Sequence, residues 1–163
     1  MRLKPLISIL SLVLVSTGFA QKQNINTTID AWHKSAENAN FESYFGLMTE
    51  DAVFVGSDAS EVWNYEEFKA FSKPYFDAGK AWTFKSVSRN VYINENENMA
   101  WFDEVLNSDH MGLCRGSGVL IQTKNGAWKI KHYVLSLAVP NPLVDELVKQ
   151  KSKLDRKYLE TLH

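Results

Sequence analysis

The chain has 163 residues, a length that suits a single domain. Its composition, 45% hydrophobic and 23% charged, lies near the globular average and argues against wholesale disorder, collagen-like repeats and a polytopic membrane protein. The formal net charge of −1 gives no electrostatic reason to expect a nucleic-acid partner. Cys114 is the single cysteine, the histidines lack ligand-like spacing, and no phosphate loop or dinucleotide fingerprint is present, so we expect no metal and no cofactor.

The first 20 residues have the layout of a secretory signal peptide. Arg2 and Lys4 provide a basic start, an apolar stretch follows at 6–15, and small residues stand at positions −3 and −1 of a cut after Ala20. The apolar stretch is too short for a transmembrane helix, which needs about 20 such residues. We therefore expect cleavage near Ala20, a periplasmic or extracellular location, and a mature chain, residues 21–163, without a membrane span.

The mature chain has the pattern of one α+β domain, with helices first and a curved antiparallel sheet after them. Apolar residues at three- and four-residue spacing predict the first helix, and alternating apolar residues predict the strands. A change of apolar parity within 82–93 predicts a bulge, and the pair Asn125-Gly126 predicts a hairpin turn. The expected elements are helices at 25–39, 41–48 and 65–76, strands at 52–55, 82–93, 99–106, 112–123 and 127–139, and a C-terminal helix at about 142–161.

The register of the last hairpin gathers polar residues on one face. A two-residue turn at Asn125-Gly126 places Val119 opposite His132 by counting back along both strands. On the same face Arg115 and Ser117 then lie among aliphatic side chains. Because buried polar groups need partners, we expect Arg115, Ser117 and His132 to form the polar part of a pocket.

The acid that accompanies these residues depends on the preceding loop. A four-residue loop between the strands at 99–106 and 112–123 places Glu104 on the face of Arg115. A loop of three or five residues places Asp103 and Trp101 there instead. The sequence leaves both alternatives open.

A second pair of candidates, Glu61 and Trp63, follows the turn-rich segment 56–60. These two residues are candidates for the lip of the pocket, and a surface loop anchored by Trp63 is the alternative.

The opposite face of the last hairpin is apolar. It pairs Gly118 with Tyr133 and Gly116 with Leu135, and it continues to Leu137. Glycine opposite a large side chain permits close approach of another surface, and a large apolar patch in water usually marks an interface. We therefore expect a homodimer that packs through this face, with the C-terminal helix as the competing cover.

Several segments in the same order resemble one known family. They are GSDASEVW at 56–63, EEFKAF at 66–71, AWFDEVL at 100–106, CRGSGVL at 114–120, WKIKHYVLS at 128–136 and VPNP at 139–142. Together they resemble the SnoaL-like branch of the nuclear transport factor 2-like (NTF2-like) superfamily over roughly residues 25–148. The resemblance implies a cone in which a strongly curved sheet wraps over the N-terminal helices and encloses a pocket, often in a dimer packed through the sheet.

The resemblance decides little about activity, because one fold hosts many functions. The superfamily includes ketosteroid isomerases, dehydratases, polyketide cyclases and members that only bind ligands or subunits. Its isomerases and cyclases use a carboxylate base in an apolar cavity, which implies Asp103 or Glu104 as the base, with Arg115 or His132 polarising a carbonyl. The alternative is that the acid and Arg115 form an ion pair, with His132 as a hydrogen-bonded core histidine.

We expect an exported domain that binds a small organic ligand bearing a carboxylate or a carbonyl, since arginine pairs well with such groups. An isomerase, dehydratase or cyclase and a non-catalytic dimerisation module are the alternatives. The catalytic candidates are Asp103, Glu104 and His132. The expected pocket residues are Arg115, Ser117, His132, Glu104, Trp101, Trp63 and Glu61.

Overall fold

The structure, a computed structural model, describes the backbone of residues 6–94, 96 and 98–162, with side chains from Ala20 onward. The basic start of the expected signal peptide, in residues 1–5, lies outside the described residues, and cleavage after Ala20 stays a prediction. The first helix, α1 (Leu6–Glu37), passes through the expected cut. None of the helices in the described part of the chain is both long and apolar enough to cross a membrane.

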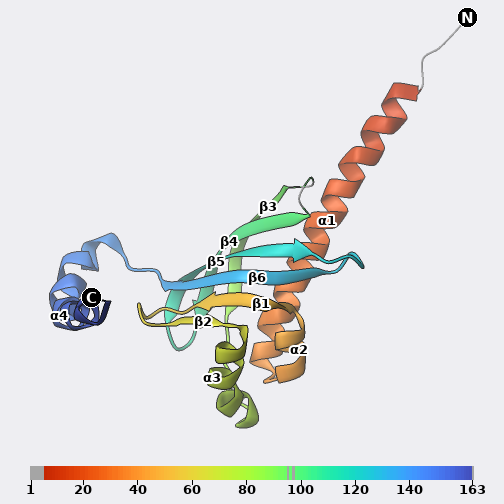
Figure 1. Cartoon of the computed structure of the whole chain (residues 1–163). Helices are drawn as coiled ribbons and strands as arrows, with labels where there is room; N and C mark the ends of the chain where they lie inside the picture. The colour runs from red at the N-terminus through yellow and green to blue at the C-terminus, as the bar shows by residue number, and fades with distance from the viewer. Residues whose placement is uncertain (1–5, 95, 97, 163) are drawn as a thin grey trace, which may run out of the picture.

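Six strands form one curved sheet in the order β2-β1-β6-β5-β4-β3 (Figure 1). All neighbouring strands are antiparallel except β1 and β6, which run parallel. The expected α+β class, with helices before a curved sheet, is confirmed. The strands are β1 (Met48–Val55), β2 (Val62–Asn64), β3 (Lys85–Asn94), β4 (Met99–Ser108), β5 (Gly112–Gln122) and β6 (Trp128–Leu137).

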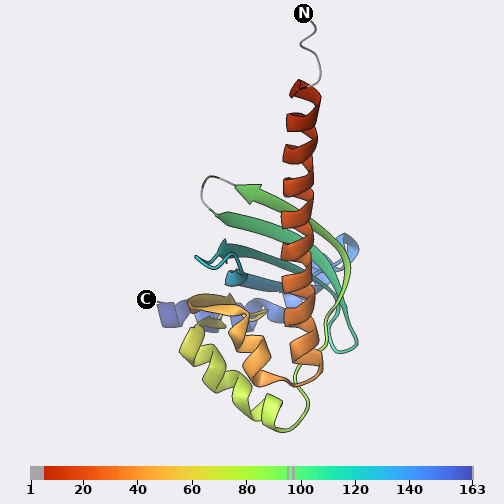
Figure 2. The ribbon, with the colours of Figure 1, turned by 90° about the vertical axis from the view of Figure 1, so that its right-hand side faces the viewer.

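Three helices cover the concave face of the sheet. Figure 2 shows α1 running across the strands, with α2 (Phe41–Gly46) and α3 (Tyr65–Asp77) packed beside its C-terminal end. The side chain of Asn64 caps α3 in a capping box with Glu67, so the helix begins directly after β2. This cap fixes the angle at which α3 leaves the sheet, and it therefore positions the side chains of α3 over the concave face.

The core between these helices and the sheet is rich in aromatic rings. Trp32 of α1 stacks on Tyr44 of α2 with 4.8 Å between ring centroids. Phe54 of β1 stacks on Phe68 of α3 at 4.0 Å. Such ring pairs contribute about 0.5–1.5 kcal/mol each beyond the area that they bury. The core thus joins all three helices to the sheet.

The predicted register of the last hairpin is correct in the half that lies farther from the turn. Val119 pairs with His132 and Arg115 with Ser136, as expected. Between Val119 and Leu120 the register shifts by one residue, so that Gln122 pairs with Trp128 near the turn. A bulge therefore accompanies the turn, which the two-residue loop did not predict.

The expectation about which face of this hairpin lines the interior is wrong. Cys114, Gly116, Gly118 and Leu120 point inward on β5, and Arg115 is exposed on the convex side. Side chains alternate between the two faces along a strand, and no bulge interrupts this half of the hairpin, so every second residue there points inward. The glycine-rich face belongs to the core.

That glycine-rich face, with Tyr133, Leu135 and Leu137, was the expected dimer interface; helices of the same chain cover Tyr133 and Leu135, whereas Leu137 is 49% exposed. Tyr133 and Leu135 are 1% and 7% exposed beneath the helices of the core. The glycines make room for side chains of neighbouring strands rather than for a second subunit. A Cβ atom at Gly116 would lie 2.3 Å from the Tyr133 hydroxyl, and one at Gly118 would lie 2.8 Å from the Phe102 ring.

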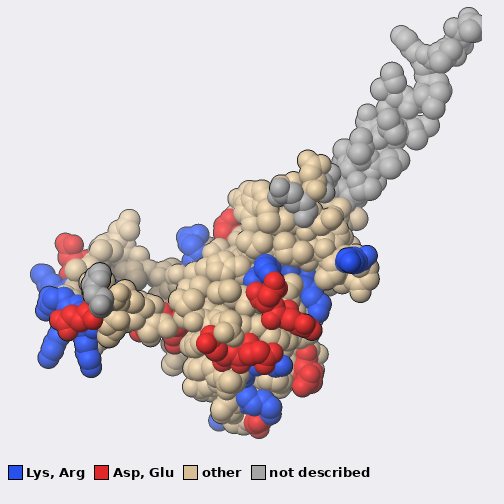
Figure 3. Space-filling model, in the orientation of Figure 1, with Lys and Arg blue, Asp and Glu red and all other residues tan. Residues whose placement is uncertain are grey.

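The C-terminal helix is present, and it extends away from the sheet. After a short 3-10 turn, η2 (Asn141–Leu143), α4 (Val144–Leu159) leads to a second turn, η3 (Glu160–Leu162). None of the described residues of α4 is buried, and Tyr158 donates a hydrogen bond to the Ala59 carbonyl at 2.8 Å. Figure 3 shows lysine and arginine side chains gathered on this helix. The helix therefore does not cover the apolar hairpin face that it was expected to compete for.

Candidate functional site

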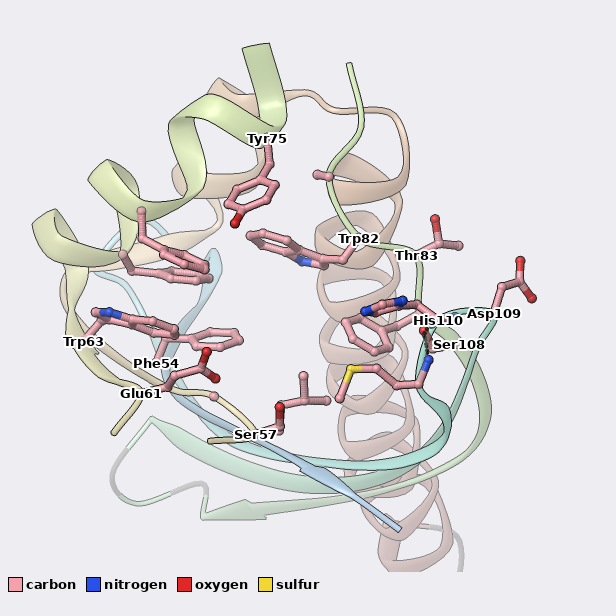
Figure 4. Close-up of a pocket in the computed structure, with 17 residues that line it drawn as sticks. Phe54, Ser57, Glu61, Trp63, Tyr75, Trp82, Thr83, Ser108, Asp109 and His110 are labelled. Atoms are coloured by element: carbon pink, nitrogen blue, oxygen red, sulfur yellow. Dashed lines mark hydrogen bonds between the residues drawn. The ribbon is translucent and has the colours of Figure 1, made fainter. Parts of the chain in front are cut away.

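A cavity of about 460 Å³ opens between α3, the loop between β1 and β2, the segment 81–84 and the turn between β4 and β5 (Figure 4). Its lining is mainly aromatic, with several polar groups at the rim. The aromatic residues are Phe54, Trp63, Phe68, Phe71, Tyr75, Trp82 and Phe84, and the polar ones are Ser57, Glu61, Thr83, Ser108, Asp109 and His110. Gly56, Ala81, Met111 and Leu135 complete it.

The aromatic wall is a consequence of helical spacing next to a strand. Phe68, Phe71 and Tyr75 follow one another at intervals of three and four residues, so they share one side of α3. The indole of Trp63, on β2, stacks on Phe71 with 4.5 Å between centroids. Trp82 faces Phe68 at 5.8 Å from the segment that precedes β3. Rings thus stand on both sides of the cavity.

Glu61 is held at the cavity rim by its own loop. The amide of Gly56 donates to the Glu61 carbonyl at 2.8 Å, and the amide of Asp58 donates to Glu61 Oε2 at 3.2 Å. A Cβ atom at Gly56 would lie 2.2 Å from the same carboxylate oxygen, so glycine is needed for this approach. Figure 4 shows the carboxylate directed toward the cavity.

His110 reaches the cavity from the opposite side. It lies in the turn between β4 and β5, where its backbone amide donates to Ser108 Oγ at 3.3 Å. The Met111 amide lies 3.4 Å from the same hydroxyl oxygen. In Figure 4 the imidazole points toward the cavity and the neighbouring Asp109 carboxylate points away from it. Glu61 and His110 are therefore the acid–base groups that face this space.

The turn between β4 and β5 also settles the open question of the acid. Ser108 pairs with Gly112, so the loop has three residues. In that register Asp103 lies opposite Ser117, and Glu104 lies opposite Gly116 on the other face. Asp103 thus shares the face of Arg115, and Glu104 does not.

The structure divides the expected pocket residues among three places. Glu61 and Trp63 line the cavity. Glu104 is buried on the concave side of the sheet. The convex side, outside the cavity, carries Asp103, Trp101, Arg115, Ser117 and His132. The prediction that Arg115, Ser117 and His132 surround a pocket is therefore wrong. The three residues do share one face of the hairpin, but that face is the convex one.

Glu104 lies at the centre of a buried hydrogen-bond network and is 1% exposed. Its Oε1 atom lies 2.8 Å from His33 Nε2 and accepts a hydrogen bond from the Tyr133 hydroxyl at 3.2 Å. Its Oε2 atom accepts from Arg89 Nε at 2.9 Å. Arg89 continues the network outward, where its Nη1 atom donates to Asp30 Oδ1 at 2.8 Å. The network joins α1 to three strands of the sheet.

The charges of this network keep Glu104 ionised. Burial raises the pKa of Glu104, but the hydrogen bond and charge of His33, together with Arg89, outweigh burial and lower the pKa below its ordinary value. Burial and the adjacent carboxylate raise the pKa of Tyr133 well above its usual range. A general base needs access to its substrate and a pKa near the working pH. Glu104 does not line the cavity, and its lowered pKa makes it a weak base.

The sequence analysis missed several residues of the cavity lining and of the Glu104 network, although the sequence pattern around two of them indicates that they point inward. Arg89 has the same parity as Val91 and Ile93 in the strand pattern, which places it inward. His33 adjoins Trp32 on the apolar side of α1. His110 left no such signal, because only the folded chain brings the turn between β4 and β5 near α3, whereas Tyr75 shares the helical spacing of Phe68 and Phe71. Within the described residues, no group of three or more His, Cys, Asp or Glu side chains is arranged to hold a metal ion.

Comparison with known proteins places this geometry among related folds. A model of the SnoaL-like domain matches residues 25–140. A domain of unknown function with a cystatin-like fold from Nostoc punctiforme is 14% identical, with a TM-score of 0.64 over 88% of this chain and 94% of that one. No curated protein matches the chain.

Two further solved structures carry provisional enzyme names. One, from Streptomyces avermitilis, is provisionally named a dehydratase of the NTF2-like family; it is 16% identical, with a TM-score of 0.62 over 72% of this chain and 96% of that one. The other, from Novosphingobium aromaticivorans, is provisionally named a scytalone dehydratase; it is 10% identical, with a TM-score of 0.64 over 77% and 89%. At these identities the likeness shows the fold alone.

Proposed function

Because the chain belongs to the SnoaL-like domain family, we propose that its aromatic cavity binds a small organic ligand. The observation that carries this proposal is the cavity itself, about 460 Å³ in volume and walled by rings, with a few polar groups at its rim. Ligand pockets in proteins have volumes of about 300–1,000 Å³ and a mainly apolar lining with a small number of placed polar groups. Both properties support ligand binding as the function of this space.

The cavity changes the expected chemistry of the ligand. The preference for a carboxylate rested on Arg115, which lies on the convex side of the sheet. None of the described residues that line the cavity is a lysine or an arginine, and two of them, Glu61 and Asp109, are acids. An anionic ligand would therefore meet the Glu61 carboxylate, which points into the cavity, without a compensating guanidinium or ammonium group. We propose a ligand that is largely apolar and that need not carry a carboxylate.

A second candidate function is an isomerase- or dehydratase-like reaction. Glu61 and His110 line the same cavity from opposite sides, and a carboxylate and an imidazole are the usual groups for moving a proton to and from a bound substrate. The provisional names of the relatives from Streptomyces avermitilis and Novosphingobium aromaticivorans are consistent with such chemistry. In this reading Glu61, rather than Asp103 or Glu104, is the base.

We also propose that the protein is exported and that α1 is shortened to residues 21–37. The layout of the first 20 residues supports the proposal. Ile25, Ile29 and Trp32, which pack in the core, follow the expected cut, so cleavage after Ala20 would leave them in place. N-terminal sequencing of exported material should begin at Gln21, and an intact Met1 would contradict export by cleavage.

Homodimerisation remains a proposal, now through the convex side of the sheet. Tyr92 and Trp101 stack there with 5.6 Å between centroids, and each is nearly half exposed. Exposed apolar patches of this kind favour an interface. Light scattering of wild-type protein and Trp101→Lys tests it: a dimer that becomes a monomer in the variant supports the proposal, and a wild-type monomer contradicts it.

Ligand binding is tested with 1-naphthylmethanol, a neutral aromatic probe, by isothermal titration calorimetry. Ala81→Phe fills the cavity from its wall, and Ala59→Phe adds the same ring to the exposed loop between β1 and β2 as a control. We expect Ala81→Phe to weaken binding at least about tenfold, equivalent to about 1.4 kcal/mol, and Ala59→Phe to bind like wild type. Absence of binding to wild type, or equal binding by Ala81→Phe, would contradict the proposal.

A further inference from the structure

The ionisable side chains that line the cavity leave a negative charge without a protein partner. Glu61 forms no ion pair with any of the described residues, and among them only the Asp58 amide donates a hydrogen bond to its carboxylate. Some acids elsewhere in the chain are paired, as Glu104 is with His33 and Arg89 and Asp51 is with Lys131. Glu61 is thus an acid held at an aromatic cavity without a cation of its own.

The aromatic rings around Glu61 add to the negative electrostatic potential of its carboxylate. The face of an aromatic ring carries negative electrostatic potential, and a cation within about 6 Å of a ring centroid is attracted, most strongly by tryptophan. Trp63 is two residues from Glu61, which directly precedes β2, and both side chains line the cavity. Trp82 stands across the cavity, and Tyr75 directs its hydroxyl toward the same space (Figure 4). Carboxylate and ring faces therefore favour the same sign of ligand charge.

From this juxtaposition we infer that the cavity recognises an organic cation, an ammonium group attached to an aromatic or bulky apolar body. The inference rests on the proposed ligand-binding function and specifies its ligand class. The apolar body lies among the rings of α3 and the segment 81–84. The ammonium group lies at the rim, where it contacts the face of Trp63 and donates hydrogen bonds to Glu61. Aromatic rings combined with one carboxylate are a recurring solution for ammonium recognition.

Three probes of equal size and different charge test this inference: 1-naphthylmethylammonium, 1-naphthylmethanol and 1-naphthoate. Isothermal titration calorimetry at low ionic strength measures each dissociation constant, since salt screens charge at an open rim. We expect the ammonium probe to bind about tenfold more tightly than the alcohol, a ratio within the range of cation–π and carboxylate contributions. The naphthoate should bind more weakly than the alcohol.

A pair of charge variants assigns the preference to Glu61. In Glu61→Gln, the ammonium probe should bind no more than about twofold better than the alcohol, while the affinity for the alcohol stays within about twofold of wild type. Glu50→Gln removes an equal charge from an exposed position of β1 outside the cavity lining and should keep the wild-type ratio. Circular dichroism confirms that both variants are folded.

The outcomes separate this inference from the proposed function. If all three probes bind with equal affinity, or the naphthoate binds best, the cation preference is overturned and ligand binding stands. If Glu61→Gln retains the full preference for the ammonium probe, the assignment to Glu61 is overturned. If none of the probes binds, the proposed function fails and the inference fails with it.

Discussion

His33 of α1 and Glu104 of β4, 71 residues apart in sequence, meet on the concave face of the sheet with 2.8 Å between Nε2 and Oε1. Because a carboxylate only accepts hydrogen bonds, the imidazole nitrogen must carry the proton of this contact. The same carboxylate accepts hydrogen bonds from Arg89 and Tyr133. The contact therefore fastens α1 to the strands, and the acid most central to the fold is separate from the acid at the cavity.

Replacing Glu104 should destabilise the protein strongly. Glu104→Gln takes the anion away from His33 and leaves Arg89 with the exposed Asp30 as its remaining carboxylate partner, and breaking a buried ion pair by removing one partner costs about 3–5 kcal/mol. Urea unfolding measures the free energy of unfolding of both proteins. Asp103→Asn is the matched control, because Asp103 is the neighbouring acid on the convex side, where most substitutions cost within about 0.5 kcal/mol. Equal stability of wild type and Glu104→Gln would contradict the structural role of the network.

The stability that Glu104 provides should depend on pH in the acid range. The folded-state pKa of Glu104 lies below its ordinary value of 4.5, so the unfolded chain takes up this proton at a higher pH than the folded protein does. The contribution is therefore fully present above pH 4.5 and is lost as pH falls through the folded pKa. Thermal melts of wild type and Glu104→Gln should differ by a constant amount near neutrality and converge below that pH. A difference that grows on acidification would oppose this account.

Gly116 should not tolerate a side chain. A Cβ atom there would lie 2.3 Å from the Tyr133 hydroxyl and 3.0 Å from Glu104 Oε1, inside the buried network. Overpacking of this kind costs about 1–3 kcal/mol. Gly46→Ala is the control, because nothing lies within 4 Å of its new Cβ atom and alanine favours the helix. Chemical denaturation should show a loss for Gly116→Ala alone, and equal behaviour of the two variants would count against the close packing at Gly116.

Gly56→Ala should displace the carboxylate of Glu61 and destabilise the loop between β1 and β2. The Cβ atom of Gly56→Ala would lie 2.2 Å from Glu61 Oε2 and 2.8 Å from Glu61 Cβ. The carboxylate can rotate away from the new methyl group, but Glu61 Cβ can move only with its backbone. We expect a lower melting temperature and a loss of about 1–3 kcal/mol in the free energy of unfolding, the usual cost of overpacking. The affinity for 1-naphthylmethylammonium should fall several-fold, with little change for 1-naphthylmethanol. An equal loss for both probes would indicate that the substitution deforms the cavity rather than the carboxylate.

The sequence predicted the fold better than the site, for physical reasons that particular residues illustrate. Strand alternation, the bulge in the strand at 82–93 and the distal register of Val119 with His132 follow from local pattern. The choice of inward face does not, because both faces of β5 and β6 carry apolar residues. Gly116 seemed to invite another surface, whereas it makes room for Glu104.

The sequence analysis identified cavity residues only where they are close to one another in sequence. Glu61 and Trp63 adjoin one turn and were candidates for a pocket lip, with a surface loop as the alternative; both line the cavity. His110 and Trp82 join the same cavity from segments distant in sequence, and only tertiary packing brings them there. The register of one hairpin places Arg115, Ser117 and His132 on the same face, but it does not show that the helices cover the opposite face.

The indole N–H resonances of the five tryptophans provide the most direct test of the aromatic cavity. Trp63 and Trp82 line it, Trp32 and Trp128 are buried in the core, and Trp101 lies on the convex side of the sheet. In ¹⁵N-edited spectra of a titration with 1-naphthylmethanol, we predict that the signals of Trp63 and Trp82 shift together and saturate at one dissociation constant. The signals of Trp32, Trp101 and Trp128 should move little. Saturable shifts at Trp101 with none at Trp63 and Trp82 would place the ligand outside the cavity and contradict the account.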